Sequence, residues 1–455
     1  MRHSSEIDMC SGPLVGNLLR FSLPLMASGI LQLLFNAADI IVLGQFASSS
    51  AMAAVGATSS LNSLMVNLFL GLSIGCSVVM AHSYGAQDWR RVQDTVHTAI
   101  LLALFCGAAL ILLGLPLLPV LLGWMDTPAD LMDQSVLYMR IVFLGMPAMM
   151  AYDFGAGILR AIGDTRRPLF FLTAAGITNA CLNVFFVLVF HMDVAGVALA
   201  TSISQYLSAG LILRCLARPG TRYQLHPRQL RLHKATLLQI LRVGLPAGIQ
   251  SVVFSVSNVL IQSSINSFGT LAVAGSTAAA NIENFVYTAM ESVYQAALNF
   301  TSQNIGAGQK ERVPLILRDC LLLVAVIGAI LGGLAVLFGR QLLSIYTSDP
   351  QVLPYGIDRI HVVCLTYLLC GLMDVACGVV RGMGAAVTPT VVSLTGACGL
   401  RIVWIFTVFG SMHSLFVLYL SYPVTWIVTF TMHMVCFVWF YRRLRRSGAA
   451  TLHTA

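Results

Sequence analysis

The chain has 455 residues, of which 57% are apolar and 10% are charged, against about 25% charged in an ordinary soluble domain. This composition excludes a soluble enzyme as the main body of the protein. The net charge of +8 does not indicate a nucleic-acid partner, because the basic residues lie in short segments between apolar runs. At about 20 to 25 residues per span, the length accommodates about twelve transmembrane helices, and we predict an all-α membrane protein.

The apolar runs predict two sets of six spans in chain order. The first set lies near residues 18–44, 52–82, 95–122, 135–159, 168–190 and 195–216. The second set lies near residues 237–265, 272–302, 314–339, 354–380, 390–410 and 415–440. The longest polar stretch separates them, so we expect an N-lobe over 1–216, a cytoplasmic linker over 217–235, a C-lobe over 236–441 and a basic cytoplasmic tail over 442–455.

Arginine and lysine predict the orientation, since cytoplasmic segments carry an excess of both. With the N-terminus inside, most of the 26 basic residues fall in inner segments or their flanks. The exceptions are Arg140, Arg340 and Arg359, which fall outside, and Arg401, which lies within a span. We therefore expect both termini to be cytoplasmic, with no cleaved signal peptide.

The two halves repeat each other in sequence. Asp153, Arg160 and Pro168 return 221 residues later as Asp374, Arg381 and Pro389, and Leu23-Pro24 returns as Leu245-Pro246 with a slip of one residue. Because each half has an even number of spans, both enter the membrane from the same side. The sequence therefore predicts two pseudo-symmetric six-helix lobes related as a parallel repeat.

One acid stands inside the first apolar run. Gln32, Asn36 and Asp39 are spaced i, i+4 and i+7, so they share one face of a helix. An ionised carboxylate at the centre of a bilayer costs roughly 3 kcal/mol on insertion scales, and such residues usually face a bundle interior or a watery cavity. We predict that this face lines a cavity, the alternative being a helix-packing hydrogen bond or an acid at the membrane interface.

The second half carries further polar faces. They comprise Asn258 and Gln262 on the seventh span, Glu283, Asn284 and Glu291 on the eighth, and Asp374 on the tenth. We expect them to line a substrate cavity, although Arg401 could instead neutralise Glu291 or Asp374 in a buried structural pair. The symmetric Asp153 and Asp374 are equally compatible with a shared structural role.

Glycine pairs spaced four residues apart predict close helix packing rather than catalysis. They are Gly71 and Gly75, Gly328 and Gly332, and Gly378 and Gly382. The sequence has no HExxH, Walker loop or paired cysteine motif, so we expect neither an enzyme nor an ATPase, and no cofactor or resident metal. Energy must then come from an ion gradient or from the substrate.

Several segments together resemble one family. FNAADIIVLGQF, SYGAQD, QNIGAGQ, LRAIGDTRRP with VRGMGAAVTP, and DVAGVALATSISQ are similar to the multidrug and toxic compound extrusion (MATE) family, within its DNA-damage-inducible-protein-F-like branch. The resemblance covers almost the whole chain. It implies a V-shaped pair of lobes in the inner (plasma) membrane that rock to export amphipathic, often cationic, drugs or metabolites in exchange for H⁺ or Na⁺.

The resemblance also implies a coupling site. Asp39 matches the coupling acid of the branch, and Asn179, Asn183 and Thr201 match the polar cluster around it. Many relatives carry aspartate where this chain has Asn183, so proton coupling and a weakened sodium site both stay open. The partners implied are small amphipathic molecules and the lipid bilayer, and we expect a monomer.

Two other functions are compatible with the same fold. A lipid-linked oligosaccharide flippase of the same superfamily would favour a cationic cavity, whereas the embedded groups counted from the sequence are five acids and one arginine. A receptor or scaffold without transport is disfavoured by the repeat, because alternating access uses two matched lobes.

Overall fold

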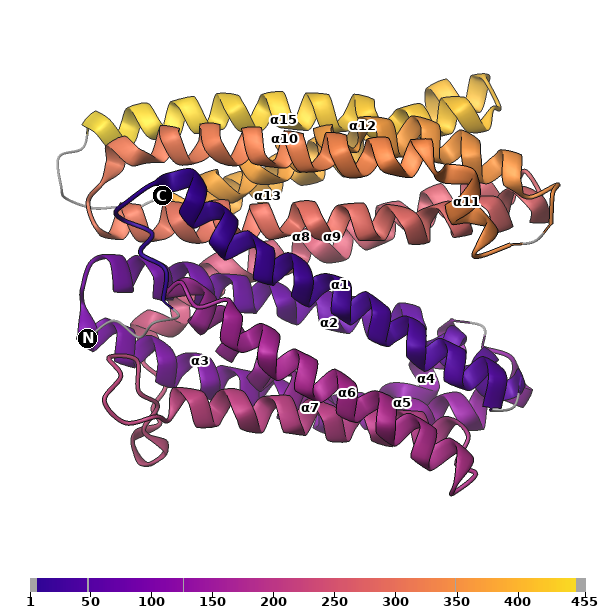
Figure 1. Cartoon of the computed structure of the whole chain (residues 1–455), viewed down its shortest axis with the longest axis horizontal. Coiled ribbons are helices and arrows are strands. Elements are labelled where there is room, and N and C mark those ends of the chain that lie inside the picture. Colours follow the sequence, from indigo (N-terminus) through magenta and orange to yellow (C-terminus); the bar gives the residue numbers. More distant parts are fainter. Residues whose placement is uncertain (1–5, 47–48, 126, 348, 447–455) are drawn as a thin grey trace. The chain divides into compact units, whose positions relative to one another are not determined.

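Long helices make up the protein in a computed structural model that describes residues 6–46, 49–125, 127–347 and 349–446. Arg2 and the part of the predicted tail beyond Arg446 lie outside these residues. Within them the structure is all-α (Figure 1). The predicted fold class is therefore confirmed.

The first half contains six membrane-length helical segments. They are α1 (Leu14–Phe46), α2 (Ser49–Gly85), α3 with η1 and α4 (Trp89–Trp124), α5 (Ala129–Ala161), α6 (Arg166–Leu188) and α7 (Val194–Leu216). The chain then passes through a linker with one short 3₁₀ turn, η2 (Pro227–Gln229). Asp88 caps α3 by accepting a hydrogen bond from the backbone N–H of Arg91.

The second half repeats this order. It consists of α8 (Lys234–Asn266), α9 (Thr270–Gly306), η3 (Lys310–Arg312), α10 (Val313–Leu337), the short α11 (Gly339–Ser344), α12 (Leu353–Gly382), a segment from α13 to η5 (Val387–Phe409) and α15 (Leu415–Arg446). The segment from α13 to η5 alternates α13 (Val387–Ser393), η4 (Leu394–Gly399), α14 (Leu400–Trp404) and η5 (Ile405–Phe409), in which η4 and η5 are π-helical.

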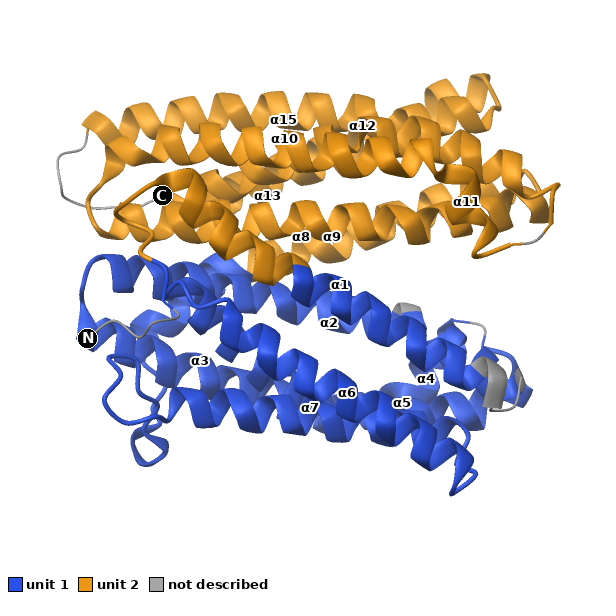
Figure 2. Ribbon diagram, viewed as in Figure 1, with its two compact units in different colours: residues 1–7, 27–244 blue, residues 8–26, 245–455 orange. Residues whose placement is uncertain are grey.

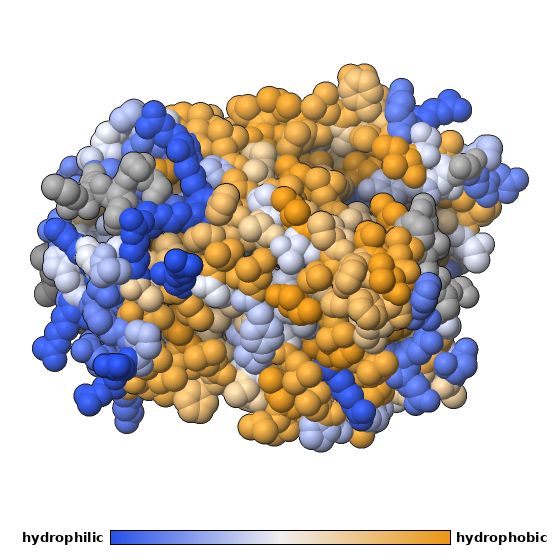
Figure 3. Space-filling model, turned by 60° about the horizontal axis from the view of Figure 1, so that its bottom comes forward, coloured by the Kyte–Doolittle hydropathy of each residue, from blue (hydrophilic) through white to orange (hydrophobic). Residues whose placement is uncertain are grey.

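Eleven helical segments in the described chain are long and apolar enough to cross a membrane. The remaining long helix, α9, has 37 residues, or about 55 Å of rise, and carries the predicted acids Glu283 and Glu291. With α9 the structure contains the twelve membrane-length helices that the sequence predicts. On the face drawn in Figure 3, hydrophobic side chains occupy the middle and hydrophilic ones gather toward the two ends.

The chain forms two compact units, coloured separately in Figure 2. Unit 1 comprises Met1–Ile7 and Ala27–Gly244, and unit 2 comprises Asp8–Met26 and Leu245–Ala455. The chain therefore passes between units inside α1 and again inside α8. Each passage lies within three residues of a proline, Pro24 or Pro246, which removes a backbone hydrogen bond and weakens the helix there.

The internal repeat is visible in the backbone of each unit. Gly163 follows α5 with φ +92°, and its repeat counterpart Gly384 follows α12 with φ +94°. Gln87 and its counterpart Gly308 likewise have φ of 55° and 74°. Such left-handed conformations are uncommon outside glycine, so their recurrence 221 residues apart reflects the same turn built twice.

Close helix packing at glycine is confirmed. A Cβ atom added to Gly332 on α10 would lie 2.3 Å from the carbonyl oxygen of Cys364 on α12, and one added to Gly382 would lie 2.8 Å from the carbonyl oxygen of Leu298 on α9. At such distances only glycine lets the two backbones approach so closely.

Candidate functional site

The predicted coupling residues come together inside unit 1. Asp39 lies on α1, Asn179 and Asn183 lie one turn apart on α6, and Thr201 lies on α7. The Asn183 side-chain amide donates a hydrogen bond of 2.5 Å to Asp39 Oδ1. The Asn179 amide lies 3.3 Å from Thr201 Oγ1. Three helices therefore build one polar cluster around a single carboxylate.

The orientation of the Asn179 amide strengthens this cluster. When its nitrogen and oxygen take the positions that satisfy both, Nδ2 lies 2.8 Å from Asp39 Oδ1. Both asparagines then donate to the same carboxylate oxygen, and hydrogen bonds to an ionised acceptor are roughly twice as strong as neutral ones. The Oδ1 atom of Asn183 is buried and has no hydrogen-bond partner in the described chain, so one acceptor beside Asp39 stays unused.

Asp39 is half-buried, whereas Gln32 and Asn36, on the same face of α1, are exposed. Asn179 and Asn183 are buried, with relative exposures of 6% and 0%. The carboxylate thus stands at the boundary between the packed interior of unit 1 and an accessible surface. That position suits a group that exchanges a small ion with its surroundings.

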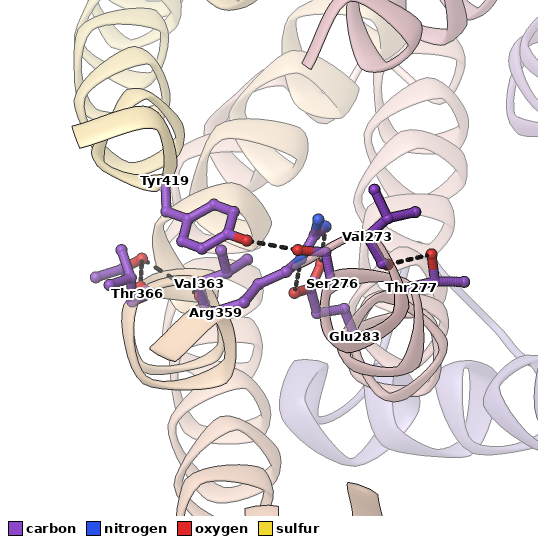
Figure 4. Close-up of polar contacts among 9 residues, drawn as sticks. Val273, Ser276, Thr277, Glu283, Arg359, Val363, Thr366 and Tyr419 are labelled. Carbon is purple, nitrogen blue, oxygen red and sulfur yellow. Dashed lines mark hydrogen bonds and ion pairs between the residues drawn. The ribbon is translucent and has the colours of Figure 1, made fainter. Parts of the chain in front are cut away.

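A buried ion pair dominates the polar interior of unit 2 (Figure 4). Arg359 of α12 donates from Nε and Nη2 to the two carboxylate oxygens of Glu283 on α9, at 2.7 and 2.8 Å. Both side chains are less than a tenth exposed. Beside the pair, Ser276 Oγ and the hydroxyl of Tyr419 are 2.5 Å apart. Glu283, predicted to line a substrate cavity, therefore has a permanent cationic partner.

The sequence analysis missed this partner, because it assigns Arg359 to the outer flank of a span. Arg359 is 6% exposed and lies seven residues into α12. The count of one embedded arginine is therefore wrong, since Arg359 and Arg381 are also buried. Hydropathy averages over a window and does not reveal that a basic residue near a helix end turns inward to meet an acid.

Arg401 has different partners from those weighed in the sequence analysis. Its Nη1 donates to Asn258 Oδ1 of α8 at 3.3 Å, and its guanidinium carbon lies 4.5 Å from the ring centroid of Tyr422 on α15. In the described chain no acid lies within ion-pair distance of it. Neither Glu291 nor Asp374 therefore neutralises Arg401.

The other predicted cavity residues of unit 2 are dispersed over two faces. Asn284 and Glu291 are exposed on α9, and Gln262 donates to Asn266 on α8 at 3.1 Å. The half-buried Asp374 accepts a long hydrogen bond of 3.9 Å from Cys370. The assignment of these side chains to substrate contact stays a prediction.

Asp153, the repeat counterpart of Asp374, serves helix packing through its backbone. Its carbonyl oxygen accepts a hydrogen bond of 2.8 Å from Ser73 Oγ on α2. Its Oδ2 atom is buried without a hydrogen-bond partner among the described residues.

These features define a class. A chain of twelve membrane-length helices, folded as two repeated units with a lone acid in an amide cluster, has the organisation of a membrane transporter. The sequence model of the MatE family matches residues 24–185 and again residues 246–407, so the repeat offset is 222 at both ends of the match. These segments make up more than half of the chain, which therefore belongs to the MATE family of multidrug efflux transporters.

Individual relatives agree with this assignment. The chain is 28% identical over 389 residues to a probable multidrug resistance protein, YoeA, of Bacillus subtilis, covering 84% of each chain. It is 26% identical over 355 residues to an FAD transporter of Shewanella oneidensis, covering 76% of this chain and 77% of the relative. The family is thereby established, while the narrower branch stays a prediction.

Solved structures show the same fold. An outward-facing multidrug resistance MATE family transporter of the MOP superfamily superposes with a TM-score of 0.88 at 20% identity, covering 98% of this chain and 99% of the other. A MOP superfamily transporter from Pyrococcus furiosus, described as having a binding pocket of reverse polarity, gives a TM-score of 0.88 at 20% identity, with the same coverage.

Proposed function

We propose that the protein is a cation-coupled antiporter that exports amphipathic, cationic organic compounds by alternating access of its two units. The observation that carries the proposal is the Asp39 cluster, in which Asn179 and Asn183 orient a lone carboxylate on the first helix of a MATE family chain. It acts in the inner membrane as a monomer with both termini cytoplasmic, the orientation that the basic residues favour.

The chemistry follows from the charge of Asp39. When ionised, the carboxylate attracts a cationic amphipath. A proton or sodium ion that enters from outside neutralises it and releases the cargo, and the empty unit returns. Each cation needs oxygen acceptors, and the cluster supplies the Asp39 carboxylate, the unused Oδ1 of Asn183 and the hydroxyl of Thr201. Hard cations prefer such ligands.

The direct test is transport in proteoliposomes with imposed pH or sodium gradients, read with a fluorescent cation. Asp39→Asn keeps the size and hydrogen bonding of the side chain but removes the charge that the coupling ion must neutralise. We expect gradient-driven export to fall by at least about tenfold, while the purified variant keeps the wild-type elution profile and melting temperature. Export by Asp39→Asn at the wild-type rate, under the same gradient, would refute the proposal.

A further inference from the structure

The helix segment that carries Arg401 is irregular where its repeat counterpart is regular. Arg401 lies on the five-residue α14, between the π-helical η4 and η5. The counterpart, α6, is an uninterrupted α-helix of 23 residues. Single π-helical turns inside α-helices occur frequently at functional sites. The sequence and the structure thus both single out this segment of unit 2.

The repeat gives Arg401 a counterpart of known surroundings. The offset is 221 at Pro168 and Pro389, before η4, and 222 at the end of the family match, beyond it, as expected when a π turn takes in one extra residue. At an offset of 222, Arg401 corresponds to Asn179 of the Asp39 cluster. Asp39 itself corresponds to Ile261, which is buried with 1% exposure.

The two units therefore carry opposite charges at matched positions. Unit 1 has a carboxylate held by a neutral amide, whereas unit 2 has a guanidinium and an apolar side chain. Arg401 is 2% exposed, and burying an uncompensated charge is costly. Its Nε atom is buried without a hydrogen-bond partner in the described chain, and its contact with Asn258 is a long hydrogen bond to a neutral oxygen. Arg359, in the same unit, has a carboxylate on both arms of its fork.

We propose that Arg401, with Asn258 and Tyr422, forms a subsite in unit 2 for a carboxylate or phosphate group on an aromatic amphipath. The exposed Asn258 gives way to the incoming anion, which replaces a neutral acceptor by a charged one on the guanidinium fork. The ring of Tyr422 stacks 5.5 Å from that of Trp426, which lies 5.3 Å from Tyr367, so aromatic surface adjoins the anion position.

This assignment deepens the proposed function and rests on it, because it adds an acidic group to the cationic amphipaths that the transporter exports. A carboxylate of the cargo and a phosphate of a lipid headgroup share the required chemistry. We assign the subsite to the cargo, since the neighbouring rings of Tyr422, Trp426 and Tyr367 suit an aromatic body better than an acyl chain.

The test uses a matched pair of dyes, rhodamine 110, which has a free carboxylate, and its methyl ester rhodamine 123. Binding to the purified full chain is measured by fluorescence polarisation in nanodiscs of neutral lipid. We expect wild type to bind the free acid about tenfold more tightly than the ester, the difference that one charge-assisted hydrogen bond gives. Arg401→Gln should bring the ratio close to one without changing the affinity for the ester, and Arg401→Lys should give an intermediate ratio.

Asn258→Asp is the second variant, because it places a fixed carboxylate on Arg401 and leaves that buried residue intact. It too should abolish the preference for the free acid. A preference that survives either Arg401→Gln or Asn258→Asp overturns the proposal, as does an equal loss of affinity for both dyes. If added phosphatidylglycerol weakens free-acid binding in wild type but not in Arg401→Gln, the subsite belongs to lipid, and the assignment to cargo is overturned.

Failure of this inference is distinguishable from failure of the proposed function. Gradient-driven export of rhodamine 123, which lacks the acid, depends on Asp39 and not on Arg401. Wild-type export of the ester, with an unchanged acid-to-ester binding ratio in Arg401→Gln, would remove the subsite and leave the antiporter intact.

Discussion

Removing the charge of Glu283 tests how unit 2 is held together. Glu283→Gln keeps the shape of the side chain but leaves Arg359 as a buried cation whose two short hydrogen bonds, at 2.7 and 2.8 Å, lose their carboxylate. Since the side chains of both partners are less than a tenth exposed, water cannot take over. Breaking a buried pair by removing one partner typically costs about 3–5 kcal/mol, or two to three orders of magnitude in the unfolding equilibrium.

The assay is equilibrium unfolding in detergent of wild type, Glu283→Gln, Arg359→Met and the double variant Glu283→Met/Arg359→Met. The double variant should recover most of the stability, because apolar replacement of a whole buried pair is often neutral or stabilising. Glu311→Gln removes an exposed acid and serves as a control with little expected effect. A double variant that loses as much stability as the two single variants combined contradicts the reasoning.

Two further predictions concern packing and coupling. Gly332→Ala should destabilise the protein by about 1–3 kcal/mol through overpacking against Cys364, whereas a Cβ on the adjacent Gly333 meets nothing within 4 Å, so Gly333→Ala should be neutral or stabilising by up to about 1 kcal/mol; equal melting temperatures for the two variants would contradict this account of α10. Asn183→Asp adds a second carboxylate beside Asp39 and should alter the sodium dependence of transport in proteoliposomes. An unchanged sodium profile would remove Asn183 from the coupling site.

The fold was largely predictable from the sequence because membrane helices declare themselves locally. Apolar runs predict the helices to within a few residues for most spans, and the repeated Asp153 and Asp374 motifs predict two copies of one arrangement. The most polar long helix, α9, was found because polar residues on one face still leave an apolar remainder. The irregular segments were not predicted, since nothing in the residues around Arg401 distinguishes a π turn from an α turn.

The candidate site was predictable only in part. The spacing of Gln32, Asn36 and Asp39 selects one face of α1, yet of these three only Asp39 joins the amide cluster. The resemblance, and not the spacing, brought Asn179, Asn183 and Thr201 to it. Helical periodicity tells which residues share a face, but it carries no information on which helix that face meets.

The sequence by itself determined that this chain lies in a membrane, that it consists of two related halves and that one acid stands alone on its first helix, because hydropathy, repetition and charge are properties of the residues. The tertiary structure decided the partner of each embedded charge. Glu283 and Arg359 are 76 residues apart, and they meet only because α9 and α12 pack side by side. The same packing leaves Arg401 with an amide and an aromatic ring, and so makes it a candidate for ligand binding rather than for structure alone.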